Sequence, residues 1–280
     1  MSYFGATSTG AVIPTNDVGT PLMFDILALQ NIYGANMTTR MGDTVYGFGS
    51  NAGSPYDFAS NSAPQFCIWD AGGSDTLNCS GFSQSQAINL SAGAFSDVGG
   101  YKANVSIALG VVIENAVGGS GDDVITGNAT DNVLTGNGGD DRLIGGGGID
   151  TAAYSSNFHN YTISFFSSDG HIQVQDKVLS RDGIDSDYAI SSLQFSDLTL
   201  NNSISGAAGG YQAAFTATCS SSVLASSLDS LQSLCSSNLL SAITRSDKSA
   251  LTLAASTFTS DTQALAKTNS LANLFVADTP

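Results

Sequence analysis

Apolar and polar residues alternate over very short distances through most of this 280-residue chain. From about residue 37 to residue 200, short β-type segments are separated by turns rich in Gly and Asp, which is typical of many short strands. Residues 1–20 have no regular pattern. Residues 21–36 predict a helix that starts near Pro21 and ends at Gly34. Along this helix, one face is formed by Met23, Ile26, Leu27, Gln30 and Tyr33.

The pattern changes again near residue 211, where Ala, Ser, Leu and Thr dominate and Gly almost disappears. Apolar residues there recur at helical spacing. We therefore predict a helical tail over residues 211–280, with Asp247 as a candidate helix cap. Its apolar positions are Val223, Leu224, Leu228, Leu231, Leu234, Leu239, Leu240 and Ile243.

An internal repeat occupies residues 118–153. Written in nines, it reads GGSGDDVIT, GNATDNVLT, GNGGDDRLI and GGGGIDTAA. Position one is always Gly, position six is Asp or Asn, and position eight is Ile, Leu or, in the last nonamer, Ala152. This matches the G-G-x-G-x-D-x-U-x nonapeptide of calcium-binding parallel β-helices. Four nonamers in register argue against a Gly-rich linker, and no phosphate-binding glycine motif is present.

The nonamer has a direct physical meaning. Its first six residues form a tight turn, in which Gly accepts positive φ and lets carbonyl groups converge. Its last three residues form a short strand with only the eighth side chain directed inward. Two nonamers complete a coil of 18 residues, so turns stack on one side every 18 residues. Asp carboxylates and free carbonyls there suit Ca²⁺, a hard cation that takes six to eight oxygens.

Charge supports cation binding and excludes several other functions. The net charge is −16, and 23 of the 24 acidic residues are Asp, with Glu114 the single Glu. This balance argues against nucleic-acid binding and against anionic membrane surfaces. No apolar run is long enough to span a membrane, and no signal peptide is recognisable.

The four cysteines lack the C-x-x-C spacing of zinc sites. Two disulfides, one in each half of the chain, and four buried free thiols are both compatible with the sequence, and Cys219 and Cys235 are spaced to join a helical hairpin. The cysteines are Cys67, Cys79, Cys219 and Cys235.

The sequence around the nonamers resembles that of a known family. DILALQNIYGANMTTRMGDTVYGFGSN, WDAGGSDTLNCSG, INLSAGAFSDVGG and NVSIALGVVIENAVGG are similar to the C-terminal domain of serralysin-family metalloproteases, an RTX calcium-binding β-roll. The resemblance covers about residues 1–153. Residues 150–197 look like the segment that follows such repeats in type I secreted RTX proteins. The tail from about 211 resembles no family.

We therefore expect a mainly β fold: a parallel β-roll with calcium-binding nonapeptide repeats, as the repeat and the resemblance imply, with a short N-terminal helix and an α-helical C-terminal tail, as the apolar spacing predicts. Residues 1–36 would be a remnant of the protease domain, and residues 37–153 the serralysin-like C-terminal domain. Residues 154–205 would be a β-rich flanking segment, and residues 211–280 the helical tail with a candidate secretion signal.

Catalytic chemistry is not expected from this chain alone. Serralysins carry H-E-x-x-H-x-x-G-x-x-H, which is absent here, so we expect no bound Zn²⁺. The two histidines, His159 and His171, lack metal-ligand spacing. MSYF at residues 1–4 resembles the family's Met-turn, with Met1 beneath the zinc and Tyr3 near it. No G-x-S-x-G occurs, and no Cys–His pair suggests a nucleophile.

The resemblance also implies calcium ligands upstream of the nonamers. A first site would join the carbonyls of a loop to a W-D-A-G-G-x-D turn, using Arg40, Gly42, Thr44, Asp70, Gly72 and Asp75. A second, adjacent site would use Gly73, Asp75, the Val112 carbonyl and Glu114, which gives the single Glu of the chain a role.

In the nonamers, positions two, four and six would bind calcium. One edge of the roll would use Gly119, Gly121 and Asp123 with Asn137, Gly139 and Asp141. The other edge would use Asn128, Thr130 and Asn132 with Gly146, Gly148 and Asp150. Asn132 replaces an Asp, so this second edge loses one anionic ligand.

Three functions remain in competition. The first is a secreted, extracellular calcium-binding module that folds on binding several Ca²⁺ ions and serves type I secretion without a signal peptide. NLFVADTP at the C-terminus would be its export signal, although a packing helix fits this tail equally well. The second is the C-terminal part of a zinc endopeptidase whose catalytic half is missing from this chain, either encoded upstream or lost; this missing protease half would be a candidate partner. The third is a calcium-dependent surface protein.

Overall fold

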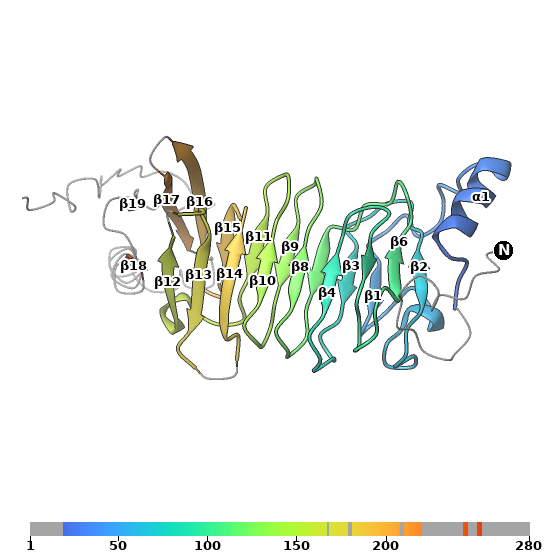
Figure 1. Ribbon diagram of the computed structural model, residues 1–280, viewed down its shortest axis with the longest axis horizontal. Coiled ribbons are helices and arrows are strands. Elements are labelled where there is room, and N and C mark those ends of the chain that lie inside the picture. The colour runs from blue at the N-terminus through green and yellow to red at the C-terminus, as the bar shows by residue number, and fades with distance from the viewer. Residues whose placement is uncertain are drawn as a thin grey trace, which may run out of the picture.

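The computed structural model describes residues 19–166, 168–178, 181–207, 210–219, 243–245 and 251–253, with side chains described up to residue 202. Within these ranges, one α-helix, α1 (Met23–Tyr33), precedes a long stack of short strands, which is interrupted by two short 3-10 helices, η2 (Ser54–Tyr56) and η3 (Phe158–Asn160). The stack is elongated, with α1 at one end and the longest strands at the other (Figure 1).

The described strands form three sheets, two of which run the length of the stack. The first sheet contains, in spatial order, β1 (Val45–Gly47), β3 (Thr76–Asn78), β7 (Asn115–Val117), β9 (Val133–Thr135), β11 (Thr151–Ala153), β15 (Ser192–Gln194), β16 (Leu198–Ala207), β17 (Gly210–Cys219) and β19 (Leu251–Leu253). The second contains β18 (Ile243–Arg245), β12 (Tyr161–Phe165), β13 (Ile172–Asp176), β14 (Ile184–Tyr188), β10 (Arg142–Ile144), β8 (Val124–Thr126) and β4 (Ala87–Asn89). The third contains β2 (Phe66–Ile68), β6 (Val105–Ile107) and β5 (Phe95–Ser96).

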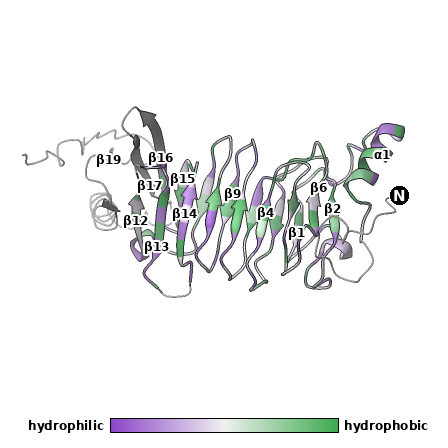
Figure 2. Cartoon of the chain, in the orientation of Figure 1, coloured by the Kyte–Doolittle hydropathy of each residue, from purple (hydrophilic) through white to green (hydrophobic). Residues whose placement is uncertain are grey.

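The 18-residue coil predicted from the nonamers is confirmed by the strand register. Val124 pairs with Arg142 and Val133 with Thr151, in parallel ladders with an offset of 18 residues. The middle side chain of each strand points inward and is fully buried, as expected for position eight. These inward residues are Ile125, Leu134, Leu143 and Ala152, each 0% exposed. Apolar colour follows the strands in Figure 2, and hydrophilic colour follows the turns.

Aromatic rings fill the interior of the roll at its N-terminal end. Phe58 packs against Phe48, Phe66 and Phe82, with ring centroids 5.2–5.9 Å apart. The predicted helix forms, and Met23 is buried in this core with Ile26 packed against it. Tyr33, however, predicted on the same face as Met23, is 80% exposed, because α1 projects from the end of the roll.

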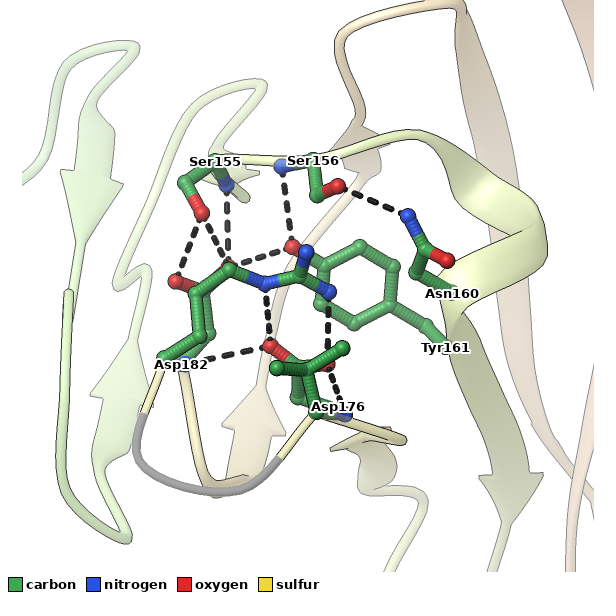
Figure 3. Close-up of polar contacts among 8 residues, drawn as sticks. Ser155, Ser156, Asn160, Tyr161, Asp176 and Asp182 are labelled. Carbon is green, nitrogen blue, oxygen red and sulfur yellow. Dashed lines mark hydrogen bonds and ion pairs between the residues drawn. The ribbon is translucent and has the colours of Figure 1, made fainter.

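The other end of the roll is closed by three longer antiparallel strands, β12, β13 and β14. A polar network ties them to the last coil (Figure 3). Asp182 accepts hydrogen bonds from the Ser155 amide (3.0 Å), the Ser155 hydroxyl (2.8 Å) and the Tyr161 hydroxyl. Arg181 donates two bonds of 2.6 Å to Asp176, whose side chain is 0% exposed. We call this element, residues 154–188, the C-terminal cap.

The tail prediction is wrong wherever the structure describes the tail. Residues 210–219 form β17, which pairs with β16 over ten residues, and residues 243–245 and 251–253 are also strands. Alternating small and β-branched residues in YQAAFTATC fit a strand beside the open edge of β16. The remaining tail, NLFVADTP and the MSYF segment lie outside the described residues.

Cys67 and Cys79 are buried free thiols, so the first half of the chain carries no disulfide between them. Burial raises the pKa of Cys67 to about 11, which keeps this thiol protonated and unreactive. Cys235 lies outside the described residues, and only the backbone of Cys219 is described.

Candidate metal centre

The nonamer turns stack in two rows, one along each edge of the roll. Turns 118–123 and 136–141 lead into β8 and β10 of the second sheet. Turns 127–132 and 145–150 lead into β9 and β11 of the first sheet. Because adjacent coils are in register, equivalent residues of neighbouring turns lie next to one another. The structure therefore brings together the two groups of predicted ligands, one on each edge.

The position-six side chains form a buried column in each row. Asp123 and Asp141 are 1% and 2% exposed, and the Asp123 amide donates to Asp141 Oδ1 at 2.7 Å. In the other row, the Asn132 amide donates to Asp150 Oδ1 at 2.9 Å. In each case, one carboxylate oxygen of the acid accepts a hydrogen bond from a backbone amide of the preceding coil. We call these residues the inner acids: Asp75, Asp123, Asp141 and Asp150, with Asn132 in the same position.

The second oxygen of three inner acids has no partner within the described residues. Asp75 Oδ2, Asp141 Oδ2 and Asp150 Oδ2 are buried and accept no hydrogen bond. A buried carboxylate oxygen without a donor costs free energy, so it requires a proton or a cation. These atoms fit a cation held between the turns.

The electrostatics of these acids lead to the same conclusion. Burial, together with the charges of Asp123, Asp122 and Asp140, raises the pKa of Asp141 to about 8 despite the hydrogen bond from the Asp123 amide. Burial, with Asp70 and Glu114 nearby, raises the pKa of Asp75 to about 6 against the hydrogen bond from Thr44. A divalent ion between the turns would supply the positive charge that these carboxyl groups lack.

Glycine keeps the carbonyl groups close to the acids. Gly139 has φ +112°, and a Cβ there would lie 2.7 Å from the Gly121 carbonyl oxygen. Gly146 has φ +105°, and its Cβ would lie 2.3 Å from the Asn128 carbonyl oxygen. A side chain at either position would occupy the space between turns. The backbones of neighbouring turns therefore approach closely at these two positions, and the calcium-ligand role of positions two and four stays a prediction.

The upstream turns are brought together in the same way. The Thr44 amide donates to Asp75 Oδ1 (2.8 Å), and the Asp75 amide donates to Glu114 Oε2 (2.7 Å). Gly73 packs on Gly42, because a Cβ on Gly73 would lie 2.7 Å from the Gly42 carbonyl. Loop 40–44, turn 70–75 and segment 112–114 are thus successive members of one stack.

Some predicted ligands have partners already. Asp70 accepts from the Tyr46 hydroxyl (2.6 Å) and the Gly72 amide (2.9 Å), and the Thr44 carbonyl accepts from the Thr76 amide (2.8 Å). In the second nonamer, Asn128 Oδ1 accepts from the Thr130 amide and hydroxyl at 2.9 and 2.8 Å. The ligand role of these residues remains a prediction, as does that of Arg40 and Val112.

Two features of the stack were missed in the sequence. Asp185 extends the first row, because its Oδ1 accepts from the Asp141 amide at 2.9 Å. Gly183 and Asp185 are spaced like positions four and six of a nonamer, so the spacing was a usable signal. Asp187 follows at the inward position, is 0% exposed and accepts from the Tyr154 hydroxyl at 2.7 Å. Its Oδ1 is also without a partner in the described structure.

Other metal chemistry finds no support in the described ranges. There, no three His, Cys, Asp or Glu side chains converge as a metal cluster, so a cation would depend on backbone carbonyls for most of its ligands. The His171 ring stacks on the Phe166 ring, with centroids 4.3 Å apart, and His171 Nδ1 lies 2.6 Å from Asp169 Oδ1. Among the described helices, none is long and apolar enough to cross a membrane.

Known proteins resemble this chain over the same region. Serralysin C of Dickeya chrysanthemi is 55% identical over 127 residues, which are 45% of this chain and 26% of that protein. The serralysins of Proteus mirabilis and Photorhabdus laumondii are each 55% identical over 130 residues, which are 46% of this chain and 26% and 27% of theirs. This chain thus spans about a quarter of the length of the curated relatives it matches.

The family model described as "Peptidase M10 serralysin C terminal" matches residues 35–244, which include the roll, both rows of turns and the C-terminal cap. The chain therefore belongs to the serralysin C-terminal domain family.

Proposed function

We propose that this chain is a calcium-binding module of a secreted serralysin-type protein. Calcium ions between stacked turns would complete its fold. The observation that carries this proposal is the set of buried, unpartnered oxygens on Asp75, Asp141 and Asp150. They recur on equivalent positions of both rows, next to backbone carbonyls, in a chain of net charge −16.

In this proposal, the residues of the stacked turns have different roles in calcium binding. The inner acids provide charge, the Gly positions provide carbonyl oxygens, and the hydrogen bonds between coils hold both in place. Bound calcium would neutralise the acids and link neighbouring coils. Extracellular modules bind calcium at about 10⁻⁴–10⁻³ M, so the fold would be completed outside the cell, where calcium is abundant. This scheme requires export from the cell, for which we propose a type I secretion system.

Calcium titration tests the proposal directly. We expect circular dichroism in EGTA to show loss of β-structure, and added Ca²⁺ to restore it in a cooperative transition. Mg²⁺ at the same concentration is the matched control, because it demands octahedral geometry at shorter distances and dehydrates reluctantly. Full β-structure in EGTA, together with no heat of calcium binding by calorimetry, would contradict the proposal.

A second function, proteolysis by a longer protein of which this module is one part, is favoured by the relatives. Those relatives are named serralysins and are about four times as long as the matched region. In that protein, this module would support a zinc-dependent catalytic domain. The coding sequence upstream of the Met1 codon separates the two functions, because only the second requires an H-E-x-x-H motif there. In a casein-cleavage assay with Zn²⁺ and Ca²⁺ we expect no cleavage by the 280-residue chain alone, and cleavage would place catalytic residues in this chain.

A further inference from the structure

A second row of acids runs outside the inner acids, at position five of the turns. These side chains are exposed, and no calcium ligand was predicted among them. We call them the outer aspartates: Asp43, Asp122, Asp131 and Asp140. Each has one oxygen bound to a backbone amide of the following coil, so none of them is a simple solvated surface charge.

The hydrogen bonds of the two rows run in opposite directions. Between turns 118–123 and 136–141, the Asp123 amide donates forward to Asp141 Oδ1 at 2.7 Å. At the same junction, the Asp140 amide donates backward to Asp122 Oδ1 at 2.9 Å. The two coils are therefore joined by a reciprocal pair of charge-assisted bonds, which we call a clasp.

The clasp recurs at three more junctions among the described turns. Between turns 127–132 and 145–150, the Asn132 amide binds Asp150 Oδ1 (2.9 Å) and the Ile149 amide binds Asp131 Oδ1 (2.7 Å). At the third junction, the Thr44 amide donates to Asp75 Oδ1 (2.8 Å) and the Ser74 amide donates to Asp43 Oδ1 (2.9 Å). At the fourth junction, the Asp141 amide donates to Asp185 Oδ1 and the Ile184 amide donates to Asp140 Oδ1, both at 2.9 Å.

One junction provides an internal contrast. Between turn 70–75 and segment 112–114, position five is Ser74, and its hydroxyl accepts only from the Asn115 side chain at 3.2 Å. The inner bond from the Asp75 amide to Glu114 is present there at 2.7 Å. The outer half of the clasp thus depends on an acid at position five and is absent where Ser replaces it.

The geometry points to a positioning role for the outer aspartates: each fixes the register of two neighbouring coils, so that the inner acids and carbonyls of the two turns face one another. Each outer aspartate binds the amide directly before the next inner acid, which restrains the backbone that carries this acid. A shift by one residue would break both bonds of a clasp. This inference rests on the proposed function for its calcium effect, and on the hydrogen bonds alone for its effect on register.

Substitution of Asp131 tests the role, because its clasp lies on the row with only one anionic nonamer ligand. The full chain is compared as wild type, D131A and D131N, with D57A as control. Asp57 also accepts from a backbone amide, that of Ala59 at 2.9 Å, but within its own turn. Asn keeps the Oδ acceptor and removes the charge, so it separates hydrogen bonding from electrostatics.

The readouts are hydrogen exchange at the Ile149 amide and calcium titration by calorimetry. We expect D131A to speed exchange at Ile149 and to weaken calcium binding by about threefold to tenfold, as the loss of one ordinary hydrogen bond at an exposed side chain predicts. D131N should restore most of the protection and of the affinity, and D57A should change neither.

Exchange at Ile149 that is the same in D131A and wild type would overturn the inference, as would equal impairment by D131A and D131N. A wild-type chain that binds no calcium would instead overturn the proposed function. The exchange comparison would still decide whether Asp131 holds the two coils together.

Discussion

Asp141 illustrates how a single side chain connects two coils and a cation. One oxygen binds the Asp123 amide, the other is buried without a partner, and its own amide binds Asp185. The position-one glycine leaves room for this carboxylate, because a Cβ on Gly136 would lie 2.1 Å from Asp141 Oδ2. The Gly and the Asp of one nonamer are therefore a single structural unit.

Replacing Asp141 by Asn should weaken calcium binding with little change in shape, since Asn keeps the Oδ1 acceptor and loses the charge. We expect affinity to fall by about tenfold or more, because ligand charge sets the affinity of calcium sites. Calorimetry measures this change. The control is D57N at an exposed turn away from both rows, and equal affinities of D141N and D57N would contradict the ligand role.

Replacing Gly136 by Ala should destabilise the roll more than replacing Gly147. The Gly136 Cβ would clash with Asp141, whereas a Gly147 Cβ would meet only Ala129 at an ordinary 3.5 Å. Overpacking typically costs about 1–3 kcal/mol. Urea unfolding in calcium compares G136A and G147A, and a similar midpoint for both variants would show that the space is not needed.

At the scale of elements, the periodic segments were predictable and the irregular ones were not. The repeat of the nonamers predicts the turns, the inward residues and the 18-residue coil. Leu134 and Leu143, predicted as inward residues, are buried in the structure. The C-terminal cap has no such period, and Asp185 acts as a turn acid without a complete nonamer around it. In the tail, strand β17 depends on pairing with β16, a tertiary contact that local helical spacing does not encode.

The cap contains a buried ion pair that differs from the cation sites, because its positive charge is covalently attached. Although burial opposes it, the hydrogen bonds from Arg181 lower the pKa of Asp176 below its usual value. Replacing Arg181 by Met would leave the buried Asp176 carboxylate without its cation. Because Arg181 is partly exposed, we expect a loss of about 2 kcal/mol, below the 3–5 kcal/mol of fully buried pairs.

Thermal unfolding at neutral pH in saturating calcium measures this loss. The matched control is K177M, which removes an exposed cation that donates to the His159 carbonyl at 2.7 Å. Because the pKa of Asp176 is lowered in the fold, its contribution is present above the unfolded pKa and is lost as pH falls. The gap between R181M and wild type should therefore shrink in acid, and a gap that stays constant would contradict this account.

At the scale of the whole molecule, the roll stacks the inner acids in rows, and within the described residues none of them forms an ion pair with a basic side chain. Its interior is apolar except at inward positions such as Asp187, whereas each edge concentrates carboxylates that neighbouring coils bring closer together. Protons or calcium ions can relieve this repulsion, and they compete for the same oxygens. Folding, protonation of the inner acids and calcium binding are therefore coupled equilibria.

This coupling predicts opposite pH dependences with and without calcium. In the calcium-free fold, the pKa of Asp141 is raised from 3.8 to about 8 and that of Asp75 from 3.8 to about 6, so the folded state holds protons that the unfolded chain has released. Such groups stabilise the fold at low pH, and this stability is lost as pH rises through their folded pKa values. The calcium-free roll should therefore unfold more easily at pH 8 than at pH 5.

With calcium bound, the acids must be ionised, so binding should release protons and strengthen as pH rises over the same range. Calorimetry in buffers of different ionisation enthalpy counts the released protons, and urea unfolding with EGTA or with calcium gives the two stability profiles. D141N removes the most strongly shifted of these two carboxyl groups, so it should release fewer protons than wild type. Equal proton release by wild type and D141N, or a calcium-free fold that gains stability towards pH 8, would contradict the coupling, because either result would mean that the buried acids are already ionised without a cation.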